Sequence, residues 1–238
     1  MGLYVETKGR GPDLVLLHGW GMHAGVWAAL LPRLTSSYRV TRIDLPGHGQ
    51  SARAGPLGRL PEVSARVAEL LPPHAICLGW SLGGLVALRM AIDQPERLSR
   101  ILLLASSPCM VRRADWDAAI DPAVLARFAS ELSTDYRGTL HRFLALQCRG
   151  LQGAQTALRH LKRILAAAPP DRHALDEGLA ILRENDLRQE VAALEQPIDL
   201  LLGERDNLVP CTLAQGLTQC CPSLGVTVLP GAGHAPFI

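Results

Sequence analysis

Short, largely apolar runs alternate with longer helical patterns over the first 104 residues. The runs at 14–17, 38–43, 75–78 and 100–104 have the length and composition of strands, and the segments at 24–34, 63–71 and 82–92 have the apolar spacing of helices. Strands that lack a polar face are typical of parallel sheets covered by helices. The pattern therefore predicts an α/β fold with a mostly parallel central sheet and helices on both faces.

The strand rhythm stops after the fourth run and returns late in the chain. Residues 111–187 contain only amphipathic helical stretches, and apolar runs reappear at 198–202 and 226–229. We therefore predict a core formed by residues 1–110 and 188–238, with an inserted helical lid at 111–187. Lids of this kind commonly form one wall of a substrate pocket.

Composition excludes several classes of protein. The 24 Lys and Arg residues nearly balance the 22 Asp and Glu residues, which argues against a nucleic-acid binder. No apolar run is long enough for a membrane span, and no basic segment followed by an apolar one marks a secretory signal. The six cysteines form neither a CxxC pair nor a zinc-binding pattern. We expect reduced thiols in a monomeric cytoplasmic protein.

The strongest chemical signal is Gly-Trp-Ser-Leu-Gly at 79–83, between an apolar strand and a helix. A GxSxG turn in this context presents a serine hydroxyl at the end of the strand. It also directs the backbone N–H of the next residue toward the position where an oxyanion would form. We predict Ser81 as the nucleophile and the Leu82 N–H as one oxyanion donor.

A serine hydroxyl needs a base, and that base needs an orienting acid. In enzymes with a GxSxG elbow these groups follow in the order Ser, acid, His. His234 follows the last predicted strand, whereas the other seven histidines precede the elbow, fall in the lid or lack a supporting context. Asp206 directly follows a strand and is the predicted acid, with Glu204 as its nearest competitor.

The His-Gly-Trp-Gly turn at 18–21 follows the first predicted strand. Its small glycines permit close approach of the loop, so we predict the Trp20 N–H as the second oxyanion donor and the Trp20 indole as part of the acyl pocket. Trp27 is more typical of a core residue. His18 and His23 lack a third ligand, so we predict no metal site, and the proposed acyl transfer requires no cofactor.

A block of basic residues occupies the predicted lid. Positions 137–163 contain no Asp or Glu but include six cations: Arg137, Arg142, Arg149, Arg159, Lys162 and Arg163. A charge cluster is usually a solvated helix face. Because this one borders the predicted active-site entrance, it also fits docking of an acidic or phosphorylated partner.

Taken together, these segments resemble the pimeloyl-[acyl-carrier protein] methyl ester esterases of biotin synthesis, within the α/β-hydrolase superfamily. The matching residues are 14–21, 78–87, 105–109, 142–147, 186–189 and 233–238. The first two segments are shared by many hydrolases. The lid segment 142–147 is more specific, because lids diverge between subfamilies.

The resemblance implies hydrolysis of pimeloyl-[acyl-carrier protein] methyl ester to methanol and the pimeloyl carrier protein. By matching position, Ser81, Asp206 and His234 form the triad. The residues implied to contact the acyl chain are Trp20, Ser81, Leu82, Phe143, Leu144, Ala145, Leu146, Gln147 and His234. The implied docking residues for the acidic carrier protein are Arg137, Arg142, Arg159 and Lys162, among which Arg142 and Arg159 match the family positions directly.

This chain departs from the family at two places. One family arginine position is Gln155 here, and Arg137 is offset by one residue from another. The family also continues into a closing C-terminal helix, whereas four residues follow His234 in this sequence, so we expect weaker support for the His234 loop.

Two other functions compete with this interpretation. The first is a general short-chain carboxylesterase with no carrier partner, which preference for a carrier-bound ester would distinguish. The second is a non-catalytic acyl-binding protein, against which the intact Ser81, Asp206 and His234 set argues. Dehalogenases and epoxide hydrolases need a carboxylate where Ser81 stands and are disfavoured.

Overall fold

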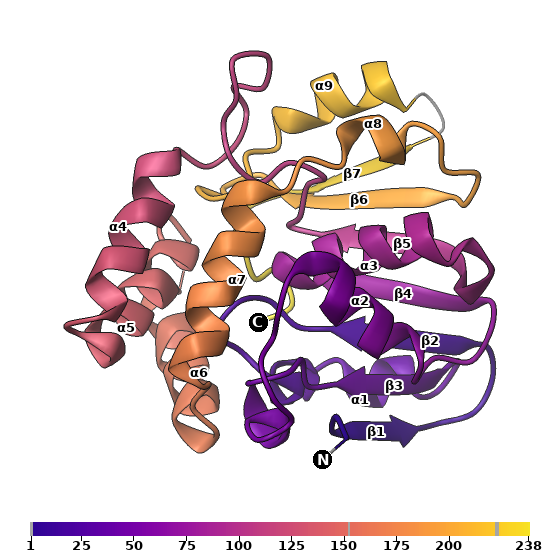
Figure 1. Cartoon of the computed structure of the whole chain (residues 1–238), viewed down its shortest axis with the longest axis horizontal. Helices are drawn as coiled ribbons and strands as arrows, with labels where there is room; N and C mark the ends of the chain where they lie inside the picture. Colours follow the sequence, from indigo (N-terminus) through magenta and orange to yellow (C-terminus); the bar gives the residue numbers. More distant parts are fainter. Residues whose placement is uncertain (1, 152, 222–223) are drawn as a thin grey trace.

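The computed structural model describes residues 2–151, 153–221 and 224–238, with a seven-stranded sheet at the centre (Figure 1). The strands lie in the order β1-β3-β2-β4-β5-β6-β7. Their bounds are Val5–Lys8 (β1), Asp13–Leu17 (β2), Arg39–Ile43 (β3), Ala75–Trp80 (β4), Leu98–Leu104 (β5), Ile198–Gly203 (β6) and Gly225–Leu229 (β7). All neighbouring pairs from β3 to β7 are parallel, which confirms the predicted mostly parallel sheet.

Strand β1 is antiparallel to β3 and was not predicted. Its four residues, Val-Glu-Thr-Lys, are largely exposed, because it lies at the edge of the sheet. An edge strand of this kind carries no continuous apolar run, and so the pattern that located the buried strands does not identify it.

The helices of the core differ in detail from the prediction. The helix expected at 24–34 is two short pieces, the 3-10 turn η1 (Ala24–Trp27) and α1 (Leu31–Leu34). Pro32 has no N–H and cannot continue a helix from the preceding turn, but it is accommodated in the first turn of a new one. The helix expected at 63–71 is α2 (Leu60–Ala68), which begins earlier because Pro61 is favourable in its first turn.

Other core helices flank the sheet. Helix α3 (Leu82–Asp93) begins directly after the turn at Ser81 and packs against α2 and against α8 (Arg188–Val191), while α9 (Leu213–Cys220) precedes β7. The short helix α8 and helix α9 were not predicted. Within the described ranges no helix is long and apolar enough to cross a membrane.

The residues between β5 and β6 form the helices α4 (Pro122–Leu132), α5 (Tyr136–Gln147), α6 (Ala154–Ala167) and α7 (Arg172–Glu184). Figure 1 shows them gathered at one side of the sheet, beyond the carboxyl ends of the parallel strands. Hydrogen bonds join them to the loops at those ends. Examples are His23 Nε2 to the Ile164 carbonyl at 2.9 Å and Asn207 Nδ2 to the Arg149 carbonyl at 2.9 Å.

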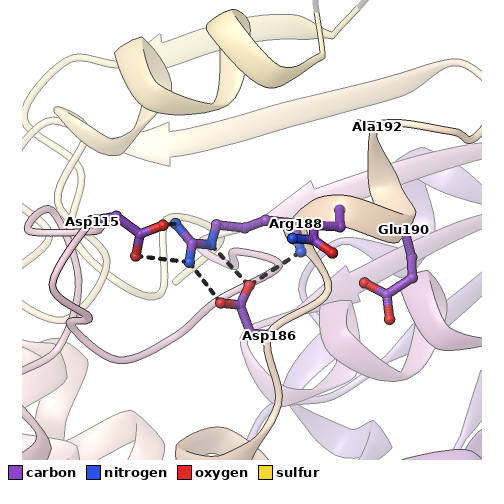
Figure 2. Close-up of a pocket in the computed structure, with 6 residues that line it drawn as sticks. Asp115, Asp186, Arg188, Glu190 and Ala192 are labelled. Carbon is purple, nitrogen blue, oxygen red and sulfur yellow. Dashed lines mark hydrogen bonds and ion pairs between the residues drawn. The ribbon is translucent and has the colours of Figure 1, made fainter.

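Arg188 joins the two chain segments that connect these helices to the sheet. Its guanidinium contacts Asp115 at 3.0 and 3.1 Å and Asp186 at 2.7 and 2.8 Å (Figure 2). It also lies over the Trp116 ring, 5.2 Å from the ring centroid. The Leu187 N–H also donates to the Pro108 carbonyl at 2.9 Å. Asp115, Asp186 and Arg188 line a pocket of about 740 Å³, in which the Arg188 guanidinium already has carboxylate partners. The motif at 186–189 therefore has a clear structural role at the base of the helical insertion.

Replacement of Arg188 by Lys is expected to lower the free energy of unfolding by about 1–2 kcal/mol, because an ammonium group cannot make the forked contacts or stack on Trp116. Urea titration measures the change. Arg183→Lys is the matched control, since Arg183 makes one exposed pair with Glu184 and should change stability by less than about 0.5 kcal/mol. Equal effects of the two substitutions would contradict the role given to Arg188.

Candidate active site

Ser81 occupies a strained turn between β4 and α3. Its backbone has φ 54° and ψ −116°, in a region that side chains rarely adopt. Three hydrogen bonds hold it there: Ser81 N–H to the Leu104 carbonyl at 3.0 Å, Gly84 N–H to the Ser81 carbonyl at 2.9 Å, and the Ser106 hydroxyl to the same carbonyl at 2.7 Å. The neighbouring strand β5 and its following loop therefore impose the turn.

The glycines of the motif are required by close contacts. A Cβ atom at Gly79 would collide with the Gly83 carbonyl, and one at Gly83 would collide with the Leu17 carbonyl at the end of β2. Their small size lets α3 begin directly against the carboxyl ends of β2 and β4. The Leu82 N–H is consequently one of the first N–H groups of α3, which have no acceptor within their own helix.

His234 and Asp206 lie close together at the carboxyl edge of the sheet, where Ser81 also lies. The loop after β6 carries Asp206 and the loop after β7 carries His234, and His234 Nδ1 lies 2.9 Å from Asp206 Oδ2. The other oxygen, Oδ1, accepts the N–H groups of Leu208 at 2.8 Å and Val209 at 3.0 Å. Glu204, the competing acid, instead accepts the Gly231 N–H at 2.7 Å.

The remaining imidazole nitrogen, His234 Nε2, is buried and has no hydrogen-bond partner among the described residues. A carboxylate on Nδ1 fixes the proton there, so Nε2 carries the lone pair that can accept a proton. The Ser81 side chain is not bonded to it in this conformation. Ser81 is 4% exposed and His234 1% exposed, so both residues are shielded from bulk water.

The loop after β2 is fixed by His18. Its Nδ1 lies 2.9 Å from the Gly19 carbonyl, and its Nε2 accepts the Leu45 N–H at 2.9 Å. The imidazole is therefore neutral, with its proton on Nδ1 directed at the carbonyl. Because a trans peptide places C=O and N–H on opposite sides, the Trp20 N–H points away from His18. Sequence reasoning dismissed His18 by chain order and missed this role.

The Trp20 indole contacts two of the inserted helices. Its N–H donates to the Leu175 carbonyl in α7 at 2.8 Å, and its ring packs edge-to-face on Phe143 of α5 with centroids 4.6 Å apart. A Cβ atom at Gly178 would lie 2.6 Å from the indole, so a glycine in α7 makes room for the ring. The loop after β2 thus lies directly against the helical insertion.

The segment 143–147 divides between two sides of α5. Phe143, Leu144 and Gln147 are buried, whereas Ala145 is exposed and Leu146 is half-buried. The latter two line an outer groove of about 430 Å³ together with Arg127, Arg142 and Arg149. A helix turns 100° per residue, so five successive side chains cannot face one pocket.

The predicted docking cations also separate into two groups. Arg142 pairs with Glu131 at 2.9 Å and with Asp135 at 3.0 Å, acids that lie just before the acid-free stretch. In the described part of the chain, Arg137, Arg159 and Lys162 have no carboxylate partner, and the first two are exposed. The unneutralised positive charge therefore lies on the start of α5 and on α6.

Asp44, at the end of β3, fixes loops around this edge of the sheet. Its two oxygens accept the Ala24 N–H at 2.6 Å and the Gln50 N–H at 2.7 Å. His48 lies beside it in the same buried cluster, with its Nδ1 3.0 Å from the Pro46 carbonyl and its ring 5.2 Å from His18. Asp44 and His48 therefore hold the loops at this edge of the sheet in place.

Comparison of the sequence with known proteins gives one family and relatives that share one name. Residues 12–238 match the family profile of the alpha/beta hydrolase fold. A pimeloyl-[acyl-carrier protein] methyl ester esterase of Aeromonas hydrophila is 46% identical over 240 residues, covering 100% of this chain and 94% of its own length. The enzyme of the same name from Nitrosomonas europaea is 42% identical over 237 residues, covering 99% and 94%.

Solved structures agree on the fold. An esterase from Exiguobacterium antarcticum superimposes with a TM-score of 0.89 at 20% identity, covering 99% of this chain and 90% of that chain. A hydrolase from Pseudomonas aeruginosa superimposes with a TM-score of 0.81 at 27% identity, covering 98% and 87%.

Burial lowers the pKa of His18 and of His48 to about 3, far below the usual value near 6.5. Between these values the unfolded chain binds protons that the folded chain excludes, so stability is lost as pH falls below about 6.5. Each histidine should contribute about 1.4 kcal/mol per pH unit. Urea unfolding between pH 7 and 4 gives the free energy of unfolding of the parent and of His48→Gln at each pH. The slope of this free energy against pH should be smaller by that amount in the variant.

The control is His173→Gln, at an exposed position in α7, which should leave the slope unchanged. A His48→Gln slope identical to that of the parent would show that His48 is not held neutral by burial.

Proposed function

We propose that this chain, which belongs to the α/β-hydrolase family and within it to the pimeloyl-[acyl-carrier protein] methyl ester esterases, hydrolyses the methyl ester of a carrier-bound pimeloyl group in biotin synthesis. The products are methanol and the pimeloyl carrier protein. The observation that carries the proposal is the His234 imidazole, held by Asp206 with a free Nε2 at the edge of the sheet where Ser81 stands on its strained turn.

In the proposed mechanism His234 Nε2 takes the Ser81 proton as Ser81 Oγ attacks the ester carbonyl. The Leu82 and Trp20 N–H groups stabilise the oxyanion. His234 then returns the proton to the methoxy oxygen, methanol leaves, and a water activated by His234 hydrolyses the acyl-enzyme. Asp206 holds the imidazole and stabilises its charged form.

Burial reduces the set of residues that we propose to contact the acyl chain. Trp20, Phe143, Leu144 and Gln147 lie on buried surfaces of the loop and of α5, and these are favoured over Ala145 and Leu146. We propose residues 111–187 as a lid on a core of 1–110 and 188–238. Because Ser81 is buried in the present conformation, we also propose that this lid moves to admit the substrate.

We propose that the acidic carrier protein docks on the cations of α5 and α6 that have no carboxylate partner among the described residues, of which Arg137 and Arg159 are exposed and Lys162 is half-buried. Arg137, Arg159 and Lys162 are favoured because they have no carboxylate partner in the described structure, whereas Arg142 is neutralised by Glu131 and Asp135. We also propose a cytoplasmic monomer. The three catalytic side chains come from one chain, and Cys77, Cys109, Cys148 and Cys211 are free thiols, as in a reducing compartment.

Substitution of Ser81 by Ala should lower kcat on pimeloyl-[acyl-carrier protein] methyl ester by a factor on the order of 10⁴, because it removes the nucleophile but leaves the acyl pocket. Methanol release measures the rate, and binding of the carrier-bound ester should persist. The control is Ser64→Ala, a buried serine in α2 whose hydroxyl donates to the Pro61 carbonyl. Parent-like turnover by Ser81→Ala would rule out the mechanism.

Charge reversal Arg159→Glu should raise KM for the carrier-bound ester about 5- to 10-fold at low salt and leave dimethyl pimelate hydrolysis unchanged, because only the carrier carries the opposing charge. Arg10→Glu, in the loop between β1 and β2, is the matched control and should affect neither substrate. If Arg159→Glu slows both substrates equally, the substitution acts on the fold and the docking proposal is wrong.

A further inference from the structure

Trp80 is the last residue of β4 and directly precedes the strained turn at Ser81. Its side chain is fully buried, and its indole N–H donates to the backbone carbonyl of His234 at 2.7 Å. This bond links positions 154 residues apart in the sequence. It joins the segment that carries the proposed nucleophile directly to the loop that carries the proposed base.

The same ring also contacts the loop after β2. A Cβ atom at Gly19 would lie 3.0 Å from Cε3 of Trp80, so the Gly19 backbone rests on the indole. The centroid of the Trp80 ring also lies 5.8 Å from that of the His234 imidazole and 5.0 Å from that of the Phe237 ring. One side chain therefore contacts the loops of the proposed oxyanion donor and of the proposed base.

We propose that Trp80 is a positioning residue for catalysis, whose indole N–H sets the place of His234 relative to Ser81. The inference rests on the proposed function, in which His234 takes the Ser81 proton. His234 has two anchors: Asp206 holds its side chain at Nδ1, and Trp80 holds its backbone at the carbonyl oxygen. With the backbone anchor removed, the residue can pivot about the Asp206 bond and carry Nε2 away from Ser81.

The anchor is effective because Trp80 is covalently adjacent to Ser81. Any shift of the turn moves the indole and, through the 2.7 Å bond, the His234 loop with it. A displacement of about 1 Å in a reacting group can slow catalysis on the order of 10²-fold. The position of Nε2 thus depends on a donor that Phe or Leu at position 80 would lack.

Trp80→Phe tests this, because it keeps an aromatic ring and removes the donor. We expect kcat on dimethyl pimelate to fall about 10- to 100-fold with KM nearly unchanged. The rate at which a fluorophosphonate labels Ser81 should fall in the same proportion, since labelling also needs His234 in place. A purely structural defect would lower the melting temperature without this selective loss of kcat.

Two other buried tryptophans supply controls. Trp27 Nε1 has no hydrogen-bond partner among the described residues, so Trp27→Phe removes an indole without removing a bond. Trp116 Nε1 donates to the Cys109 carbonyl at 3.0 Å, so Trp116→Phe loses a comparable bond at the base of the helical insertion. Both variants should retain kcat within roughly threefold of the parent.

If the parent is active, a kcat of Trp80→Phe within roughly threefold of the parent value would overturn this inference alone. A parent with no esterase activity would overturn the proposed function and the inference with it. If Trp80→Phe does not fold, benzothienylalanine at position 80 keeps the bicyclic shape and replaces the N–H by sulfur. Full activity of that protein would overturn the role of the donor, and a selective loss of kcat would support it.

Discussion

The backbone of Ser81 is the constraint on which the rest of the site depends. A positive φ at a serine is unfavourable by about 1–3 kcal/mol and persists only where the surroundings impose it. Here the imposing groups come from the neighbouring strand β5, from Ser106 and from the glycines that let α3 approach β2 and β4. The turn places the proposed nucleophile at the carboxyl edge of the parallel sheet, where the loops after β2, β6 and β7 also end.

Side chains of the protein hold those loops in place through hydrogen bonds. His18 directs the Gly19 carbonyl, Asp44 binds two loop N–H groups, and Asp206 uses one oxygen for its own loop and the other for His234. Burial keeps His18 neutral by lowering its pKa to about 3, so the ring keeps one donor and one acceptor nitrogen at neutral pH. The proposed chemistry at Ser81 therefore depends on groups that never touch the substrate.

Much of this arrangement was predictable from the sequence. Apolar runs identify buried parallel strands well, and the order of Ser81, Asp206 and His234 placed these residues at strand ends that a parallel sheet brings together. The edge strand β1 was missed because its exposed residues carry no apolar pattern. The prediction of one continuous helix at 24–34 was wrong, because it followed the apolar spacing and gave too little weight to the break at Pro32.

Contacts between distant segments could not be predicted. The acid-free stretch at 137–163 indicated a cluster of cations at the predicted entrance, but Arg142 is neutralised by two acids that precede that stretch. Asp135 caps the same helix, α5, and the packing of α4 on α5 brings Glu131 to Arg142. The bond from Trp80 to the His234 carbonyl has likewise no local signature, because its acceptor is a backbone atom. From the sequence alone, a tryptophan beside a predicted nucleophile fits a core residue as well as it fits a positioning residue.

The most direct test of the central claim is the rate of methanol release by the parent enzyme from two substrates, pimeloyl-[acyl-carrier protein] methyl ester and dimethyl pimelate. Each is measured at about 20 mM and about 500 mM salt, which changes the screening of surface charge several-fold. The account predicts a strong preference for the carrier-bound ester at low salt that shrinks at high salt, while the free ester is unaffected. Equal and salt-independent rates for the two substrates would contradict carrier recognition by the helical insertion, and no turnover of either would contradict the account as a whole.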